Sequence, residues 1–338
     1  MVDVGPEHFK EVKQLSRPDI LFRICKESNT DQVFIGSSTA QVYAVDPLAT
    51  EPVFTEFSGH SSYVMGLVDT GTHLISAGYD RSMIWWNKET RALIRREENA
   101  HDRWIRNLTV SPDQKTVISV GDDMVCKLWD AQTGEEIRTL KGHQLVTENH
   151  FPNMLYAAAV SPNGKWIATV DRIAKIKIWD FQTGQEVKEF EAPKCYTWDP
   201  KQRIHSIGGI RSVTFSPDSK SVAVGGIGQI GNIDHLDAPG RVEIFEIESG
   251  VKTHEFEGDD KFKGLVEQIV FHPSGRWLIA VGGKDKGWIQ FLDLEKKETL
   301  RQENVPMHVH QISVTDDFST IYAAGHGRLV VWSLTKSD

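Results

Sequence analysis

The sequence predicts an all-β fold that is assembled from small, repeated antiparallel sheets. Two observations support this prediction: short strand-like runs end at turn signals, and the same pattern recurs along the 338 residues. Residues 100–143 show the pattern most clearly, as the runs WIRNLTV, TVISVG, MVCKLWD and EEIRTLKGH with no helix signal between them. The last run is the most polar and should be the outermost strand. A four-stranded sheet cannot bury both faces alone, so we expect it to stack on copies of itself.

A two-residue ending of the predicted third strand recurs along the chain and marks each copy. The second residue of each ending stands at position 46, 87, 130, 180, 246, 293 or 333. The turns SPDQK, SPNGK, SPDSK and HPSGR separate first and second strands in four units, and Gly-His or Ala-His pairs at 59–60, 100–101 and 142–143 precede three units. In these features the sequence resembles the WD-repeat family over almost its whole length. Seven units of this family imply a single seven-bladed β-propeller domain of four-stranded antiparallel blades, spanning residues 1–338.

The two chain ends are expected to close this ring together. The seventh unit begins at Met307, stops soon after its third strand, GRLVVWSL, and lacks an outer strand. The alternating segment EHFKEVKQL near the N-terminus can supply that strand, as WD-repeat propellers commonly do. We therefore predict a closing strand within residues 1–18 and seven blades within residues 19–338, with a disordered tail as the alternative. Closure removes an exposed sheet edge.

Composition restricts the partners and the compartment. The net charge of −9 argues against general binding of nucleic acid or anionic membranes. No run of 18 apolar residues occurs and the N-terminus has no apolar stretch of signal-peptide length, so we expect no membrane span. Cys25, Cys126 and Cys195 lack metal-ligand spacing and favour a reducing compartment. We predict a cytoplasmic protein and, because a closed ring leaves no edge that demands pairing, a monomer.

Two groups of polar residues could be mistaken for catalytic triads, but they recur in register. Each group holds a His, a Ser, an Asp and a Trp ten residues after the Ser: His60, Ser76, Asp80 and Trp86 in one unit, and His101, Ser119, Asp123 and Trp129 in the next. A duplicated triad is expected of a repeat and not of an active site. In the WD-repeat family these residues form a structural tetrad between strands and an inter-blade loop. We predict that role here, and no catalytic residues.

The fourth unit departs from the tetrad pattern. It retains His143, Thr169 and Trp179 but has Ile173 where the Asp should stand. We therefore expect an incomplete tetrad and a less rigid blade at this place.

Extra residues cluster in the fourth and fifth units. They fall at 144–154, 192–209 and 226–240, in the two loop classes that emerge on one face of a propeller. Long loops on a rigid scaffold commonly carry binding sites, and neutral insertion is the alternative. The loops hold side chains that suit a binding surface: Phe151, Tyr196, Trp198, His205 and His235.

Two motifs in the third loop are weaker signals. Residues 226–231 spell GIGQIG, the pattern of a dinucleotide-binding loop, but no helix signal follows to hold a pyrophosphate. Asn232, Asp234, His235 and Asp237 could ligate a cation, although their spacing fits no calcium or zinc signature. We predict no cofactor and no metal site. A ligand-binding or metal-binding propeller, including an enzymatic one, with its site at these loop residues and His205 is the alternative.

The central opening on the same face offers a second candidate surface. Alignment of the first strands places Tyr63, Trp104, Met154 and His308 just before the entry residue, and Met65, Arg106, Tyr156, Arg211, Glu267 and His310 just after it. Members of the WD-repeat family often bind partner peptides through these positions and through the residue before the tetrad Asp, here Tyr79 and Asp122. The predicted partner-binding set is Tyr63, Tyr79, Trp104, Arg106, Tyr156, Trp198, His205, Arg211, His308 and His310.

These features together predict a non-catalytic interaction scaffold that binds a partner protein or peptide on its loop-rich face. Aromatic and Arg side chains are the types that dominate binding hot spots. Packing between adjacent blades is the alternative role for the aromatic residues. A non-catalytic subunit of an RNA-modifying complex is a further alternative, which the acidic balance disfavours.

Overall fold

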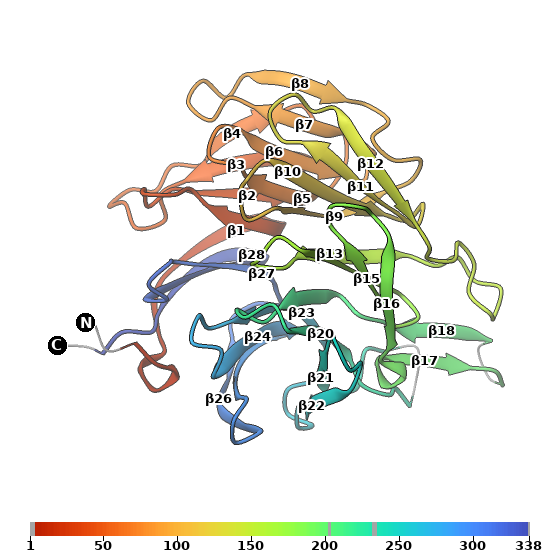
Figure 1. Cartoon of the computed structure of the whole chain (residues 1–338). Coiled ribbons are helices and arrows are strands. Elements are labelled where there is room, and N and C mark those ends of the chain that lie inside the picture. Colours follow the sequence, from red (N-terminus) through yellow and green to blue (C-terminus); the bar gives the residue numbers. More distant parts are fainter. Residues whose placement is uncertain (1–3, 202–203, 232–234, 337–338) are drawn as a thin grey trace.

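The computed structural model describes residues 4–201, 204–231 and 235–336. Within these residues the chain is all-β apart from two short 3-10 turns, η1 (Pro6–His8) and η2 (Pro193–Cys195). The strands form antiparallel sheets that lie around a common centre, as in a β-propeller (Figure 1). Across the described ranges, no helix is long and apolar enough to cross a membrane.

Five sheets of the described chain have four strands each, and each pairs its strands in chain order. The first two are β5 (Val64–Asp69), β6 (Leu74–Gly78), β7 (Met83–Trp86) and β8 (Leu93–Glu97), then β9 (Ile105–Val110), β10 (Thr116–Gly121), β11 (Val125–Asp130) and β12 (Glu136–Lys141). The third is β13 (Leu155–Val160), β14 (Trp166–Asp171), β15 (Lys175–Asp180) and β16 (Glu186–Glu191). The last two are β19 (Ser212–Phe215), β20 (Ser221–Ile227), β21 (Gly240–Glu246) and β22 (Lys252–Glu257), then β23 (Leu265–Phe271), β24 (Trp277–Gly283), β25 (Gly287–Asp293) and β26 (Glu298–Val305).

A six-stranded sheet joins the two ends of the chain, in the order β27-β28-β1-β2-β3-β4. Its strands are β27 (Val309–Val314), β28 (Thr320–Ser333), β1 (Lys10–Lys26), β2 (Val33–Ser37), β3 (Gln41–Val45) and β4 (Thr55–Ser58). The long strand β28 pairs with β27 through residues 321–325 and with β1 through residues 326–333. Strand β1 then pairs with β2 through residues 21–26.

The N-terminal segment therefore lies against the C-terminal strand, as the sequence indicated. Lys10 pairs with Ser333 at one end of this ladder and Ile20 with His326 at the other. An isolated bridge between Val4 and Thr335 extends the contact toward both ends of the described chain. Because β1 runs on to Lys26, the boundary expected between residues 18 and 19 falls inside one continuous strand.

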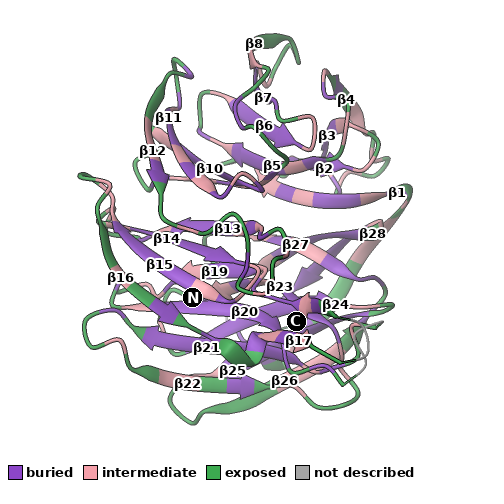
Figure 2. Cartoon of the chain, turned by 90° about the vertical axis from the view of Figure 1, so that its right-hand side faces the viewer, coloured by how far each residue is buried: buried purple, intermediate pink, exposed green. Residues whose placement is uncertain are grey.

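The first strands of the sheets lie nearest the centre. Contacts between them run through β1, β5, β9, β13, β19, β23 and β27 and return to β1. The core lies between neighbouring sheets: one buried cluster joins Trp85 of β7 to Ile105 of β9 and Trp129 of β11. The outer strands β8, β12, β16, β22 and β26 carry most of the exposed strand residues (Figure 2). Burial on both faces of the inner strands makes the assembly, not the single sheet, the stable unit.

Part of one insertion forms structure that the sequence did not predict. Residues 192–209 contain a separate two-stranded hairpin, β17 (Tyr196–Asp199) and β18 (His205–Gly208). It projects beside the main sheets at the lower right of Figure 1.

Phe9 anchors the N-terminal segment just before β1. Its ring is 7% exposed and packs against the rings of Phe291 and Trp332, with centroid distances of 5.5 Å to each. The Arg301 guanidinium lies over the Phe9 ring, 5.5 Å from the ring centroid, and donates a hydrogen bond to the Pro6 carbonyl at 2.8 Å.

We predict that Phe9→Ala lowers the free energy of unfolding by about 3 kcal/mol, because removal of a buried ring leaves a cavity at the closure. Urea unfolding followed by tryptophan fluorescence measures this change. Val12→Ala is the control, since Val12 lies exposed on the same strand. Equal unfolding midpoints for the two variants would show that the N-terminal contact contributes little.

Candidate functional site

A repeated break in strand pairing aims side chains at the centre of the molecule. Near the start of the innermost strands the register skips one residue: Phe22 of β1, Met65 of β5, Arg106 of β9, Tyr156 of β13, Glu267 of β23 and His310 of β27. A bulge of this kind bends the strand and redirects a side chain. All of these residues line one central cavity of about 220 Å³, together with Arg23, Tyr79 and Arg211.

Glycines opposite the bulges let the chain approach closely. A Cβ on Gly78 would lie 2.2 Å from the carbonyl oxygen of Tyr63, and one on Gly325 would lie 2.1 Å from that of His308. Neither contact is possible for a larger residue without movement of the backbone. The glycines therefore fix the positions of the residues that precede the inner strands.

An exposed aromatic stack lies at the mouth of the cavity. The rings of Tyr79 and Trp104 are parallel within 8° and 4.4 Å apart, and Tyr63 follows at 5.7 Å from Tyr79. Trp104 is 48% exposed and Tyr63 is 44% exposed. Phe22 packs against Tyr63 at 5.4 Å and extends the stack inward. The structure thus brings together three of the predicted partner-binding residues as one rigid surface.

Arg106 supports this stack from below. Its Nε and Nη2 atoms each donate to a carboxylate oxygen of Asp122 at 2.7 Å, and its guanidinium lies 4.8 Å from the Tyr79 ring centroid. Burial alone would lower the pKa of Arg106, but the bonds to Asp122 outweigh burial and raise it. The side chain is therefore a fixed cation, and a bidentate pair of this kind holds its geometry well.

Two further arginines line the cavity. The guanidinium of Arg211 lies 3.6 Å from the ring centroid of Tyr156, and its Nη1 donates to the Gly208 carbonyl at 3.1 Å. Arg23 donates to the carbonyl oxygens of Met65 and Arg106. Arg23 and Phe22 were not predicted, because the first unit lacks the usual repeat signals. Aligning LFRIC with VMGLV of the second unit would have placed Phe22 at the position of Met65, whereas Arg23 takes the position of Gly66, which gave no signal.

Trp198 and His205 lie apart from the ring, in the β17–β18 hairpin. The Phe151 ring contacts both, with centroid distances of 5.4 Å to Trp198 and 5.2 Å to His205. Gln229 of the third insertion donates to the Tyr196 carbonyl at 2.9 Å. The second insertion therefore contacts both of the others.

This loop cluster is continuous with the mouth of the cavity. Arg172 donates to the carbonyl oxygens of Pro152 at 3.3 Å and Ser206 at 2.8 Å, which joins the first insertion to the hairpin. The first insertion ends at Met154, whose sulfur accepts a hydrogen bond from the Tyr156 hydroxyl at 3.1 Å.

Imidazole groups gather on the other side of the cavity. The rings of His308 and His310 stack at 4.6 Å, and His326 lies 5.0 Å and 4.9 Å from them. His308 lies 3.3 Å from a carboxylate oxygen of Glu267. Burial would raise the pKa of Glu267, but the bond from His308 and the charges of the neighbouring histidines and Arg211 lower it to about 2. Burial lowers the pKa of His310 to about 3, so that ring is neutral.

These two histidines were predicted to contact a partner, yet they lie deeper than the aromatic stack. His308 is only 7% exposed. The sequence indicated that they face the centre but not that they face each other, because that depends on the bulge between them.

The His, Ser, Asp and Trp groups of the second and third units are hydrogen-bonded. His60 Nδ1 lies 2.8 Å from Asp80, its Nε2 lies 2.7 Å from the Ser76 hydroxyl, and Trp86 donates to that hydroxyl at 2.8 Å. In the third unit His101 bonds Asp123 at 2.9 Å and Ser119 at 2.7 Å, and Trp129 donates to Ser119 at 2.8 Å. Each Ser hydroxyl is held by both an imidazole and an indole.

The expectation that the fourth tetrad is incomplete is wrong. His143 Nδ1 lies 3.0 Å from a carboxylate oxygen of Asp171, which stands two residues before Ile173 at the end of β14. Asn153, from the inserted loop, donates to the same carboxylate at 3.0 Å. His143 and Trp179 also bond the Thr169 hydroxyl at 2.8 Å each. The Asn153 amide of the longer loop thus holds the Asp171 carboxylate in place. This carboxylate comes from an earlier position in its unit than the Asp of the other two tetrads.

In the third insertion, a residue considered as a cation ligand forms an ion pair within the protein. The Asp237 carboxylate lies 3.3 Å from the Lys263 ammonium, and His235 is exposed. Asn232 and Asp234 lie outside the described residues. After GIGQIG the next described element is the strand β21, so the helix that a dinucleotide site requires is not found in the described chain.

Comparison with known proteins matches part of the chain to a known repeat. The family model "WD domain, G-beta repeat" matches residues 50–87, 94–130 and 134–180. The chain is 30% identical over 102 residues to the nuclear distribution protein nudF of Emericella nidulans, a match that covers 29% of this chain and 23% of nudF. It is 27% identical over 92 residues to the small ribosomal subunit protein RACK1 of Drosophila melanogaster, covering 26% and 29% of the two chains. It is 36% identical over 93 residues to the probable coatomer subunit beta' of Schizosaccharomyces pombe, covering 26% and 11%. These matches span less than a third of each relative's length.

We predict that Asp171→Ala lowers the free energy of unfolding by about 2 to 3 kcal/mol, because it leaves His143 and Asn153 without their buried acceptor. Ile173→Ala, at the half-buried position where the Asp was expected, should cost less than about 1 kcal/mol. Urea unfolding of both variants compares the two positions. A larger loss for Ile173→Ala would contradict the assignment of Asp171 to this tetrad.

The tetrad carboxylates also predict a pH dependence. Burial opposes ionisation of Asp123, but hydrogen bonds from His101 and backbone amides outweigh it and lower its pKa. Its contribution to stability is therefore present above the unfolded-state pKa and lost as pH falls through the lower folded-state value. We predict that the stability deficit of Asp123→Asn is largest near neutral pH and shrinks below about pH 4. Urea unfolding at each pH measures the difference in free energy of unfolding between the wild type and the variant. A difference that is constant across this pH range would show that ionisation of Asp123 does not stabilise the fold.

Proposed function

We propose that this chain, in which three segments match the WD-repeat model, is a non-catalytic scaffold that binds a partner protein or peptide. The proposed binding face runs from the mouth of the central cavity to the β17–β18 hairpin. The observation that supports the proposal most strongly is the exposed stack of Tyr63, Tyr79 and Trp104 above the buried cation of Arg106.

Exposure together with rigidity makes this stack suited to binding. Trp, Tyr and Arg are the residue types that dominate binding hot spots. Trp104 is held by its stacking on Tyr79, which is held in turn by a hydrogen bond from Arg106. Side chains that are already ordered lose little conformational entropy when a partner covers them, so more of the contact energy remains for affinity.

The ring itself is proposed to have seven blades. On this interpretation the six-stranded sheet is two blades that share long strands. One consists of β27, both halves of β28 and the first part of β1, and the other of the remainder of β1 with β2, β3 and β4. The closed circle of contacts through seven innermost strands supports this count among the described residues.

A reducing compartment and a role within an assembly also belong to this proposal. The three cysteines are unpaired, and burial raises the pKa of Cys195 to about 12, which makes that thiol unreactive. One compared relative is named as a protein of the small ribosomal subunit, and another as a probable subunit of coatomer. We propose a cytoplasmic chain that is monomeric until it meets its partner.

We predict that the double variant Tyr63→Ala, Trp104→Ala loses a partner that the wild type retains. Removal of two hot-spot aromatics should weaken binding by roughly thirtyfold or more. The measurement is affinity capture from native cytosol with isotope-labelled quantification, followed by titration of the captured protein, once purified, against each variant.

The control variant is Ile137→Ala, Val187→Ala. Both side chains are exposed, but they lie on the outer strands β12 and β16, away from the cavity. It should bind like the wild type. If the double aromatic variant and this control bind every purified partner equally, the proposed face is not the binding face.

A further inference from the structure

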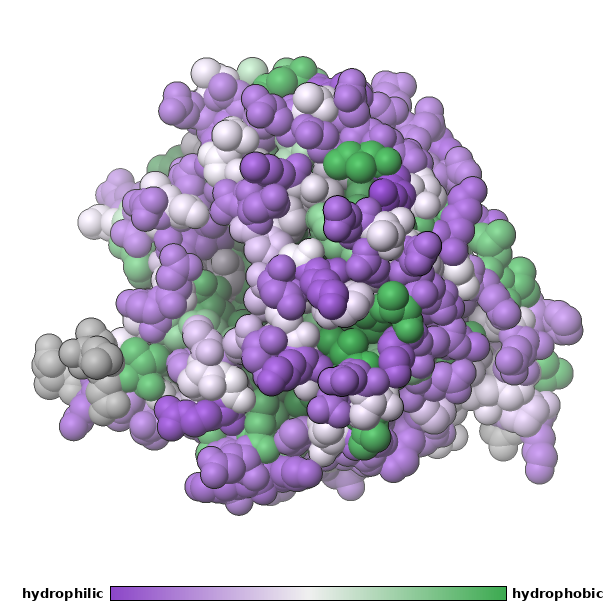
Figure 3. Space-filling view, viewed as in Figure 1, coloured by the Kyte–Doolittle hydropathy of each residue, from purple (hydrophilic) through white to green (hydrophobic). Residues whose placement is uncertain are grey.

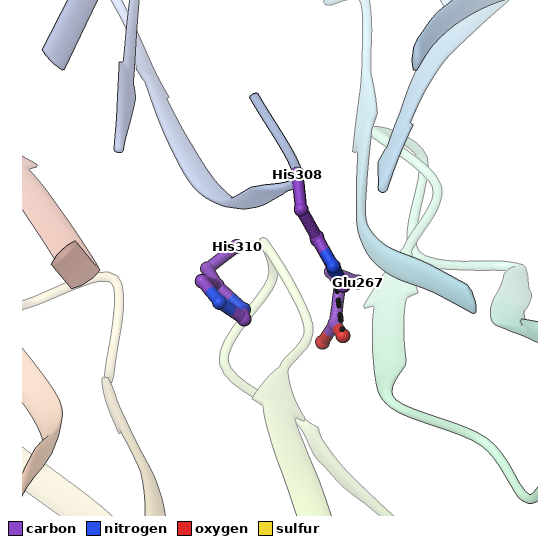
Figure 4. Close-up of side chains that lie close together, drawn as sticks. All are labelled: Glu267, His308 and His310. Atoms are coloured by element: carbon purple, nitrogen blue, oxygen red, sulfur yellow. Dashed lines mark hydrogen bonds and ion pairs between the residues drawn. The ribbon is translucent and has the colours of Figure 1, made fainter. Parts of the chain in front are cut away.

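Three side chains in the wall of the central cavity meet as metal ligands do. Glu267 comes from the bulge of β23, and His308 and His310 stand on either side of Val309 at the start of β27. Figure 4 shows the three side chains turned toward one another from these two neighbouring strands. One ligand atom from each lies within 4.8 Å of the others.

The separation of the first pair already suits a shared ion. His308 Nε2 lies 3.3 Å from Glu267 Oε1. Two ligand atoms bound to one tetrahedral zinc ion at its usual bond lengths lie about 3.4 Å apart. The His310 ring would have to move closer to Glu267 and His308 to bind the same ion as the third ligand.

Hydrogen bonding fixes which nitrogen of His308 faces the carboxylate. Its Nδ1 lies 3.0 Å from the carbonyl oxygen of Lys284, and a carbonyl can only accept, so Nδ1 carries a proton. The Nε2 atom then faces Glu267 with a lone pair unless a second proton or a cation lies between them. A histidine whose distal nitrogen donates to a backbone carbonyl is the usual arrangement around a bound metal.

His310 supplies a second, independent observation that points to a bound ion. Its Nε2 atom is buried and has no hydrogen-bond partner among the described residues. An unpaired polar atom in a protein interior is rare and calls for an occupant such as an ion or a water. His310 belongs to the same three-residue cluster.

The neighbouring charges oppose a cation but do not exclude it. Arg211 lies over Tyr156 and donates to the Gly208 carbonyl, and Arg23 donates to two other carbonyl oxygens, so both guanidiniums are committed to acceptors in the protein. Glu267 gives the cluster one negative charge. Two imidazoles and one carboxylate form the ligand set that zinc and similar ions prefer, whereas calcium and magnesium require oxygen ligands.

We propose that Glu267, His308 and His310 bind one divalent transition-metal ion, with zinc as the best probe. The ion would take the place between His308 Nε2 and Glu267 that a proton can otherwise occupy. The cavity beside the cluster leaves room for a further ligand such as water. The proposal is independent of the partner-binding role, since it concerns the chain alone.

The test is calorimetric titration of the full chain with zinc chloride near neutral pH, after treatment with a chelator. The wild type should bind one ion per chain. Glu267→Gln and His310→Gln should each weaken this binding at least about tenfold, because each removes a direct ligand. Glu267→Gln keeps the shape of the side chain, and circular dichroism of each variant verifies that it is folded.

His205→Gln is the control, because it removes an exposed imidazole of the loop cluster without touching the cavity. It should bind zinc like the wild type. A titration with cobalt(II) gives a second readout, a visible absorption band that the two ligand variants should lack. Absence of saturable binding to the wild type, or equal binding by the wild type and both ligand variants, would overturn the proposal.

Discussion

The pairing of β1 with β28 is the interaction on which the rest of the structure depends. Each sheet buries its faces only against its neighbours, so the stack must close or leave two faces and an edge in water. One N-terminal strand solves this by pairing first with the C-terminal strand and then, without a break, with β2. Phe9 covers the start of that ladder by packing on Trp332. The innermost strands are thereby held in a circle, which is what creates a central cavity.

Within the circle, the bulges turn one side chain of each bulged strand toward the central cavity. The backbone breaks register near the start of β1, β5, β9, β13, β23 and β27, so each of these strands presents one side chain to the centre regardless of its identity. The residues at these positions differ strongly in character: Arg106 and Tyr156 on one side, Glu267 and His310 on the other. Fold and function are therefore separable here, because the bulge fixes position and the side chain alone determines chemistry.

The sequence predicted what depends on local patterns and failed where one unit departs from them. Turn signals and the spacing of Trp and Asp were enough for most of the strands, and the missing outer strand of the last unit pointed to the terminal pairing. Alignment of the first strands found most of the side chains that line the cavity. Asp171 could not be found because it holds His143 from a position two residues earlier than in the other units, with help from Asn153 of an insertion. Phe22 and Arg23 were missed because their unit has neither a Gly-His pair nor a Trp ending. The hairpin in residues 192–209 was expected only as a loop, since four-residue strands carry too little pattern to recognise.

The two proposed sites border one cavity, and that has an electrostatic consequence. Arg23, Arg106 and Arg211 line the cavity together with the carboxylate of Glu267. A divalent ion bound at Glu267, His308 and His310 would add positive charge to this cavity. The cavity would then attract an acidic partner segment more strongly and repel a basic one. By linkage, a partner carboxylate that enters the cavity would in turn tighten the binding of the ion, and the free energy of that coupling must be the same measured from either side.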